Sequence, residues 1–124
     1  MKRETKVPII GIVDDDESVR DAISSLIRSA GYKSALFASA EAFLNSDQIG
    51  EMDCLIVDLQ MPRLTGLELL RGLAEMNNPI SVIFVSAHGD ELRTRALNEG
   101  AVAVLAKPFS DQALLSAIHS ALQS

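Results

Sequence analysis

The feature that most constrains this chain is a regular alternation of short apolar runs with segments of helical periodicity. Five apolar runs of five to seven residues alternate, over 124 residues, with five stretches whose apolar residues recur every three or four positions. Continuous apolar runs are typical of parallel strands that helices cover on both faces. Because crossovers between parallel strands are right-handed, this alternation predicts an α/β fold with a doubly wound five-stranded parallel sheet and five helices.

The expected elements follow directly from these two patterns. The predicted strands are 7–13, 33–37, 53–57, 80–85 and 101–105. Two helices have clear apolar stripes, one from Val19 to Ala30 that ends at Gly31 and one from Leu114 to Leu122. Shorter helices are expected over 39–47, 65–76 and 90–99, the last ended by Gly100.

Composition limits both the organisation of the chain and its partners. With 48% hydrophobic residues, the chain is able to bury one core, so we expect a single domain over residues 1–124. A net charge of −6 disfavours direct binding to nucleic acid. The lone cysteine, Cys54, favours a reducing, cytoplasmic location. The first apolar run is too short for a signal peptide or a membrane span, so no membrane association is expected.

Polar residues follow four of the predicted strands at the point where each strand ends. Asp14 and Asp15 follow the first, Asp58 the third, Ser86 the fourth and Lys107 the fifth. In doubly wound sheets ligands bind outside the carboxyl ends of the strands. Converging carboxylates need a cation, and Mg²⁺ prefers oxygen ligands. With Mg²⁺ bound, Asp58 is a candidate nucleophile for a phosphoryl group whose oxygens would contact Lys107 and Ser86.

An acidic cluster after a strand also has a purely structural interpretation. Aspartate at a helix start caps free backbone N–H groups and interacts favourably with the helix dipole. We expect that capping role for Asp16 and Glu17. For Asp14 and Asp15 we expect the cation site instead, because another acid and a lysine recur at other strand ends.

At these residues the sequence resembles the receiver domain of bacterial two-component response regulators, which is CheY-like. Four separated motifs carry the resemblance: Ile12 to Glu17, Val57 to Pro62 with Thr65-Gly66, Val85 to Ala87, and Ala106 to Phe109. The segments 40–44 and 86–90 are similar to those of the FixJ type. The resemblance implies a flavodoxin-like sheet with strand order 2-1-3-4-5.

The resemblance also implies a set of metal ligands and a phosphorylation site. It makes Asp58 the phosphoacceptor. Asp15 and Asp58 would bind Mg²⁺ directly and Asp14 through water. The backbone carbonyl of Gln60 would be a further ligand.

The resemblance also gives more specific roles to residues at the other strand ends. Ser86 stands at the switch hydroxyl, and Lys107 at the lysine that contacts the phosphoryl group. The Lys107-Pro108 peptide bond is expected to be cis, as the corresponding bond usually is in the family. Val104 stands where many receivers have an aromatic residue, so a switch that couples Ser86 to a large ring is not expected.

Two residues near the expected entrance are candidates for control of the phosphorylated state. His88 lies two residues after Ser86, and the resemblance implies that the Gln60 side chain also faces the entrance, so we expect the two residues to set the lifetime of the phosphorylated state. For His88, an exposed loop residue without such a role is the alternative. His119, in the last helix, is expected to be a surface residue, and Cys54 a packing residue.

The resemblance implies partners and an output as well. A sensor histidine kinase would donate the phosphoryl group and so switch the surface of the fourth helix, fifth strand and fifth helix. Homodimerisation through that face is common in relatives, yet Leu92, Ala96 and Leu97 fit core positions equally well. Because FixJ-type proteins often carry a DNA-binding domain after the receiver, a chain that ends at Ser124 is either a single-domain regulator or an excised receiver. It would catalyse only its own phosphorylation and dephosphorylation.

Two other classes of function remain open from the sequence. The first is a Mg²⁺-dependent hydrolase with an aspartyl-phosphate intermediate, although such enzymes usually place an acid where this chain has Gln60. The second is a module that binds partners independently of phosphorylation, which the set of Asp14, Asp15, Asp58, Ser86 and Lys107 disfavours. No glycine-rich phosphate-binding loop is present, so nucleotide binding is disfavoured too.

Overall fold

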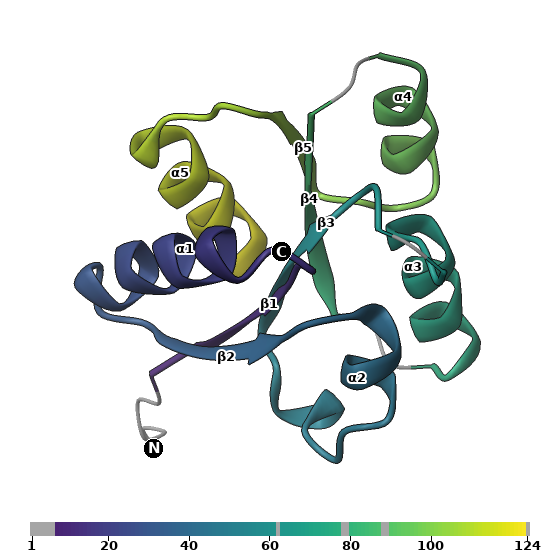
Figure 1. Ribbon diagram of the computed structural model, residues 1–124, viewed down its shortest axis with the longest axis horizontal. Helices are drawn as coiled ribbons and strands as arrows, with labels where there is room; N and C mark the ends of the chain where they lie inside the picture. The colour runs from purple at the N-terminus through teal and green to yellow at the C-terminus, as the bar shows by residue number, and fades with distance from the viewer. Residues whose placement is uncertain (1–6, 62, 78–79, 88–89, 124) are drawn as a thin grey trace.

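The computed structural model describes residues 7–61, 63–77, 80–87 and 90–123, and a five-stranded parallel sheet runs through its centre (Figure 1). The strands lie in the order β2-β1-β3-β4-β5. They are β1 Ile9–Val13, β2 Lys33–Phe37, β3 Cys54–Asp58, β4 Ser81–Ser86 and β5 Ala103–Ala106. The predicted fold class and strand order are therefore confirmed.

Helices cover both faces of the sheet. They are α1 Glu17–Ser29, α2 Ala40–Leu44, α3 Gly66–Glu75, α4 Asp90–Asn98 and α5 Asp111–Leu122, with a short 3₁₀ helix, η1, at Ile49–Glu51. Helices α1 and α5 lie on one face, and α2, α3 and α4 on the other (Figure 1). Within the described residues, no helix has the length and apolar character needed to cross a bilayer.

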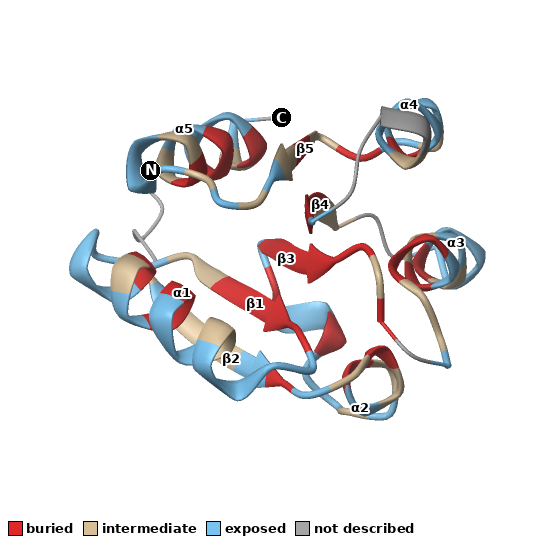
Figure 2. Cartoon of the chain, turned by 45° about the horizontal axis from the view of Figure 1, so that its top comes forward, coloured by how far each residue is buried: buried red, intermediate tan, exposed pale blue. Residues whose placement is uncertain are grey.

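The central strand β3 is buried along its whole length (Figure 2). Its side chains belong to two apolar layers. Leu55 and Val57 pack into the layer beneath α2, α3 and α4. Cys54 and Ile56 pack into the layer beneath α1 and α5. This alternation follows from the two-residue period of a strand. It confirms the expected packing role of Cys54, whose thiol has its pKa raised to about 12 by burial.

Some predicted boundaries were wrong, each for a local reason. The helix expected over 39–47 ends at Leu44, because the hydroxyl of Ser46 donates to the Phe43 carbonyl and the chain turns. The first strand begins at Ile9 rather than Val7, after Pro8, which has no N–H to donate. The expected helix ends at Gly31 and Gly100 are confirmed, with positive φ values of 98° and 109°.

The start of α3 packs so closely against β3 and β4 that Gly66 has no room for a side chain. A Cβ there would lie 2.8 Å from Phe84 Cε1 and 3.0 Å from the Asp58 carbonyl oxygen. We expect Gly66→Ala to lower the free energy of unfolding by about 1–3 kcal/mol, measured by urea denaturation. Gly72→Ala, in the same helix, is the control, because its nearest neighbour is 3.9 Å away and alanine favours helix. Equal stability of the two variants would contradict the prediction.

Candidate functional site

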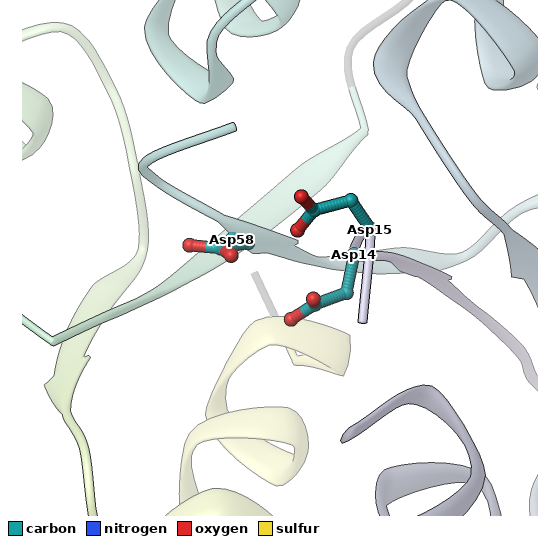
Figure 3. Close-up of side chains that lie close together, drawn as sticks. All are labelled: Asp14, Asp15 and Asp58. Carbon is teal, nitrogen blue, oxygen red and sulfur yellow. The ribbon is translucent and has the colours of Figure 1, made fainter. Parts of the chain in front are cut away.

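Three carboxylates meet at the carboxyl edge of the sheet (Figure 3). Asp14 and Asp15 follow β1, and Asp58 is the last residue of β3, the strand beside it. One carboxylate oxygen from each lies within 4.8 Å of the others. The structure thus brings together the three aspartates that the sequence pattern assigns to one site.

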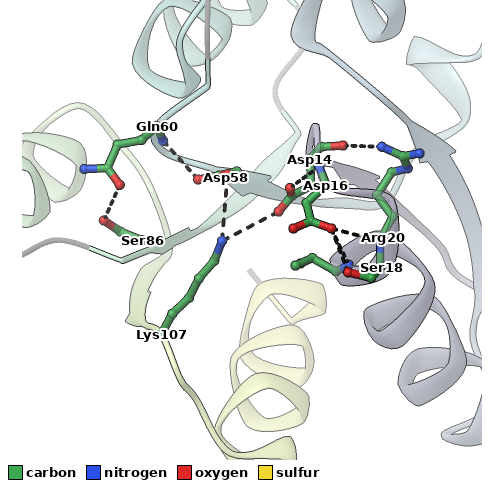
Figure 4. Close-up of polar contacts among 9 residues, drawn as sticks. Asp14, Asp16, Ser18, Arg20, Asp58, Gln60, Ser86 and Lys107 are labelled. Carbon is green, nitrogen blue, oxygen red and sulfur yellow. Dashed lines mark hydrogen bonds and ion pairs between the residues drawn. The ribbon is translucent and has the colours of Figure 1, made fainter.

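Asp14 is 1% exposed and is held on several sides. Its N–H donates to the Phe37 carbonyl at 3.1 Å, and its Oδ1 accepts from the Asp16 N–H at 2.9 Å. Its own carbonyl accepts a 2.7 Å hydrogen bond from Nη1 of Arg20 (Figure 4). These bonds fix the backbone of Asp14 at the point where β1 gives way to α1.

The neighbouring acid, Asp16, has the structural role that the sequence predicted. It is the N-cap of α1, and its Oδ1 accepts from the backbone N–H groups of Ser18 and Val19 and from the Ser18 hydroxyl (Figure 4). The Ser18 hydroxyl is the main cause that lowers the pKa of Asp16. Glu17 lies in the first turn of the helix. Asp16 therefore anchors the helix that follows the site.

Asp58 is 7% exposed, and the loop after β3 holds its carboxylate. Its Oδ1 accepts a 3.0 Å hydrogen bond from the Gln60 N–H. Between the two, the Leu59 N–H donates to the Val85 carbonyl at 2.9 Å, which joins the loop to β4. Burial and this bond give the Asp58 carboxylate a fixed position beside Asp14 and Asp15.

Lys107 extends from the end of β5 toward two of the acids (Figure 4). Its Nζ lies 3.8 Å from Oδ2 of Asp58 and 3.8 Å from Oδ2 of Asp14. Its backbone N–H donates to the Ser86 carbonyl at 2.8 Å, which keeps the ends of β4 and β5 together. The peptide bond between Lys107 and Pro108 is cis, as expected.

Ser86 and Gln60 meet on the other side of Asp58. The Ser86 hydroxyl donates to Gln60 Oε1 at 3.3 Å, so the hydroxyl of β4 and the side chain from the β3 loop are in direct contact (Figure 4). Ser86 is buried and Gln60 half-buried. His88, the other residue expected at this entrance, lies outside the described residues.

Helices α4 and α5 and strand β5 carry the other residues singled out in the sequence. Val104 is buried in the layer beneath α2, α3 and α4, and its carbonyl accepts a 3.2 Å hydrogen bond from Arg93. On α4, Ala96 is fully buried and Leu92 packs against the core, whereas Leu97 is 38% exposed. His119 is exposed, as expected.

Burial shapes the acid–base behaviour of the two innermost carboxyls. It is the main cause that raises the pKa of Asp14 and of Asp58 above the ordinary value. The N–H groups of Asp16 and Gln60 act in the opposite direction, as does the ammonium of Lys107, but they only partly offset burial. In the metal-free protein, burial therefore makes the charged form of both carboxyls less favourable than it is in water.

The buried Asp58 carboxyl makes the stability of the metal-free protein depend on pH. A carboxyl whose pKa is raised binds its proton more tightly in the folded protein than in the unfolded chain, so ionisation of Asp58 destabilises the fold as the pH rises. We expect Asp58→Asn to unfold at a higher temperature than the wild type near pH 7 in a chelator. The difference should shrink as the pH falls through the raised pKa toward 3.8.

The size of this difference in stability depends on how far burial raises the pKa of the Asp58 carboxyl. Each tenfold difference in proton affinity between folded and unfolded chains corresponds to about 1.4 kcal/mol. Asp47→Asn is the control, because Asp47 is exposed and outside the site. A constant difference between Asp58→Asn and the wild type at all pH values would contradict the prediction.

The oxygen atoms at this edge suit a hard divalent cation. Within the described residues, Oδ2 of Asp14 is the one buried side-chain polar atom that lacks a hydrogen-bond partner. Buried polar atoms of this kind call for a partner such as an ion. Three carboxylates at short range form the donor set that Mg²⁺ or Ca²⁺ accepts. The site therefore fits the predicted Mg²⁺ ion.

Sequence reasoning missed Arg20 and Arg93. Arg20 lies in the first turns of α1 and reaches back to Asp14, as side chains on a helix point toward its N-terminus. That rule, together with the capping role expected for Asp16 and Glu17, was the available signal for Arg20. The contact of Arg93 with β5 joins two elements whose separation no local pattern specifies.

The sequence of the chain matches one family of known proteins. Residues 10–119 match the model of the response regulator receiver domain. The chain is 45% identical over 118 residues to the response regulator protein TmoT of Ectopseudomonas mendocina, covering 93% of this chain and 53% of that protein. It is 37% identical over 115 residues to the transcriptional regulatory protein FixJ of Bradyrhizobium diazoefficiens, covering 92% and 56%.

A solved structure gives the same result in three dimensions. The crystal structure of FixJ-N superposes with a TM-score of 0.87 at 34% identity, covering 96% of each chain. The chain spans about half the length of the two full-length relatives above.

Proposed function

The chain belongs to the response regulator receiver domain family, and from this premise we propose that it accepts a phosphoryl group on Asp58 from a sensor histidine kinase. The single observation that best supports this is the buried Asp58 carboxylate with Lys107 and two further aspartates around it. A receiver domain is a signalling domain, and we propose that the only reaction it catalyses is its own phosphorylation and dephosphorylation.

The transfer step is a displacement at phosphorus. A carboxylate oxygen of Asp58 forms the new P–O bond while the P–N bond of the kinase's phosphohistidine breaks, and its electron pair returns to the imidazole nitrogen. The Gln60 N–H orients the attacking carboxylate through its bond to Oδ1. The other oxygen of this carboxylate, Oδ2, faces the Lys107 ammonium at 3.8 Å.

The surrounding residues offset the charge of the transferring group. The Lys107 ammonium supplies positive charge beside both Asp58 and Asp14. We propose that Asp15, Asp58 and the Gln60 carbonyl hold Mg²⁺ directly and that Asp14 holds it through water. When bound, Mg²⁺ neutralises the negative charge that the phosphoryl oxygens bring to three carboxylates.

The proposed signal leaves the site through Ser86. Once Asp58 is phosphorylated, the Ser86 hydroxyl breaks its hydrogen bond to Gln60 Oε1 and donates instead to a phosphoryl oxygen. This biases the surface formed by α4, β5 and α5 toward its active arrangement. Val104 places no aromatic ring on this path. As FixJ is a transcriptional regulatory protein, we propose control of transcription in the cytoplasm, with homodimerisation on phosphorylation.

The test is incubation with Mg²⁺ and a small phosphodonor such as phosphoramidate. We expect one phosphoryl group per chain, stable in acid and labile in base, as an acyl phosphate is, and no label when a chelator is present. Sustained phosphate release with many turnovers would favour a hydrolase instead. Absence of any label would favour a module that binds partners without phosphorylation, and would overturn the proposal.

Gln60 is proposed to control how long the phosphoryl group persists. Its side chain lies beside Asp58 and contacts the Ser86 hydroxyl, so its truncation in Gln60→Ala should open an approach for water. We expect loss of label from the phosphorylated protein to be several-fold faster than in the wild type, measured as the decay of base-labile phosphate. Gln48→Ala, at an exposed position before η1, is the control. An unchanged decay rate for Gln60→Ala would exclude this role.

A further inference from the structure

Arg20 makes a contact with the acidic site that the proposed function does not use. The residue is half-buried in α1, and its guanidinium Nη1 donates to the backbone carbonyl of Asp14 at 2.7 Å (Figure 4). A hydrogen bond from a charged donor is stronger than one between neutral groups. The helix that carries Arg20 is itself fixed to the site by the Asp16 cap. The backbone of Arg20 is therefore held in place relative to Asp14.

The carbonyl that Arg20 holds belongs to the peptide group between Asp14 and Asp15. Asp14 is buried and held by further bonds to Phe37 and Asp16, so its own position is determined several times over. Asp15 is exposed, and within the described part of the chain no hydrogen bond holds its carboxylate. The orientation of that peptide group sets the direction in which the Asp15 side chain leaves the backbone.

We propose that Arg20 is a positioning residue that fixes the Asp14–Asp15 peptide group and so directs the Asp15 carboxylate toward Asp58. This inference rests on the proposed function, because it concerns the same cation site. It assigns no contact between Arg20 and the ion. Arg20 acts through the backbone, before any cation or phosphoryl group arrives.

Positioning and simple electrostatics predict opposite results at this site. A guanidinium near three carboxylates repels an incoming cation, so if charge alone mattered, its removal would tighten Mg²⁺ binding. If Arg20 positions Asp15, its removal weakens Mg²⁺ binding, because the ligand must then be ordered when the ion binds. The sign of the change distinguishes the two effects.

The experiment is isothermal titration of the full chain with Mg²⁺, without a phosphodonor. We expect Arg20→Ala and Arg20→Met to bind Mg²⁺ about tenfold more weakly than the wild type, the scale of one charge-assisted hydrogen bond. Arg20→Lys keeps the charge and one donor and should recover part of the affinity. Arg28→Ala removes the same charge from an exposed position near the far end of α1 and should bind as the wild type does. Tighter or unchanged binding in Arg20→Ala and Arg20→Met would overturn the inference.

A second measurement needs no metal. In the metal-free protein, Arg20→Ala should shift the amide NMR signals of Asp14, Asp15 and Asp16 while those of β4 and β5 stay in place. Unchanged signals at Asp14 and Asp15 would also overturn the inference. Asp15→Asn identifies the site, because it should abolish the Mg²⁺ heat. A wild type that binds no Mg²⁺ would instead overturn the proposed cation site, so the two failures are distinguishable.

Discussion

Asp58→Asn is expected to abolish phosphorylation by both the small phosphodonor and a kinase. An amide oxygen is a far weaker nucleophile than a carboxylate, and the variant also removes one of the three charges that gather at the strand ends. Asp14 and Asp15 do not replace it, because they follow β1 and lack the bond from the Gln60 N–H that orients Asp58. The measurement is the stoichiometry of base-labile phosphate per chain, which should fall from about one to background.

Loss of label is informative only if the variant is folded. The same substitution is expected to raise the stability of the metal-free protein, because it removes a buried charge whose pKa burial raises. A more stable but unphosphorylated Asp58→Asn therefore separates loss of the acceptor from loss of the fold. Asp47→Asn, an exposed acid between α2 and η1, should retain full labelling. Retained label in Asp58→Asn would show that another residue accepts the phosphoryl group.

The sequence predicted the fold well because its strongest signals are local and repeat along the chain. The strand 33–37 was predicted to the residue, and all five strands were found. The third begins at Cys54 rather than Asp53, and the Asp53 carboxylate accepts a hydrogen bond from the Ile9 N–H at the end of the sheet. Such a bond joins residues far apart in the sequence and leaves no local pattern.

The position of the candidate site could be predicted because it follows from the topology of the sheet. Parallel strands end at one edge, so polar residues that follow Val13, Val57 and Val85 must gather there once the order of the strands is known. Asp14, Asp15 and Asp58 meet on that basis alone. That Asp58 attacks a phosphoryl group was suggested by the chemistry of a carboxylate beside a cation and made specific by the family resemblance, and it stays a prediction.

What the sequence did not predict depends on the reach and direction of individual side chains. The contact between Ser86 and Gln60 requires the distance between β4 and the β3 loop, which no periodicity specifies. The same holds for Arg93 at the Val104 carbonyl. The raised pKa of Asp14 required its burial to be known, because sequence alone does not distinguish a buried aspartate from an exposed neighbour such as Asp15.

Lys107→Ala is expected to reduce the rate of phosphorylation by about 10²–10³, the scale seen when one group that stabilises transition-state charge is removed. Its ammonium lies 3.8 Å from both Asp58 and Asp14 and, within the described residues, forms the only ion pairs with them. The measurement is the initial rate of labelling at saturating Mg²⁺. Lys33→Ala, an exposed lysine in β2, is the control.

A double-mutant cycle separates the charge of Lys107 from its contribution to the fold. Without the ammonium, two buried carboxylates lose a cation that lowers their pKa, so metal-free Lys107→Ala should be less stable than the wild type. Adding Asp58→Asn removes one of those carboxylates and should restore part of that stability, but no labelling. If Lys107→Ala cost as much stability in the Asp58→Asn background as in the wild type, Lys107 and Asp58 would not be coupled, and the charge argument for the role of Lys107 in phosphoryl transfer to Asp58 would fail.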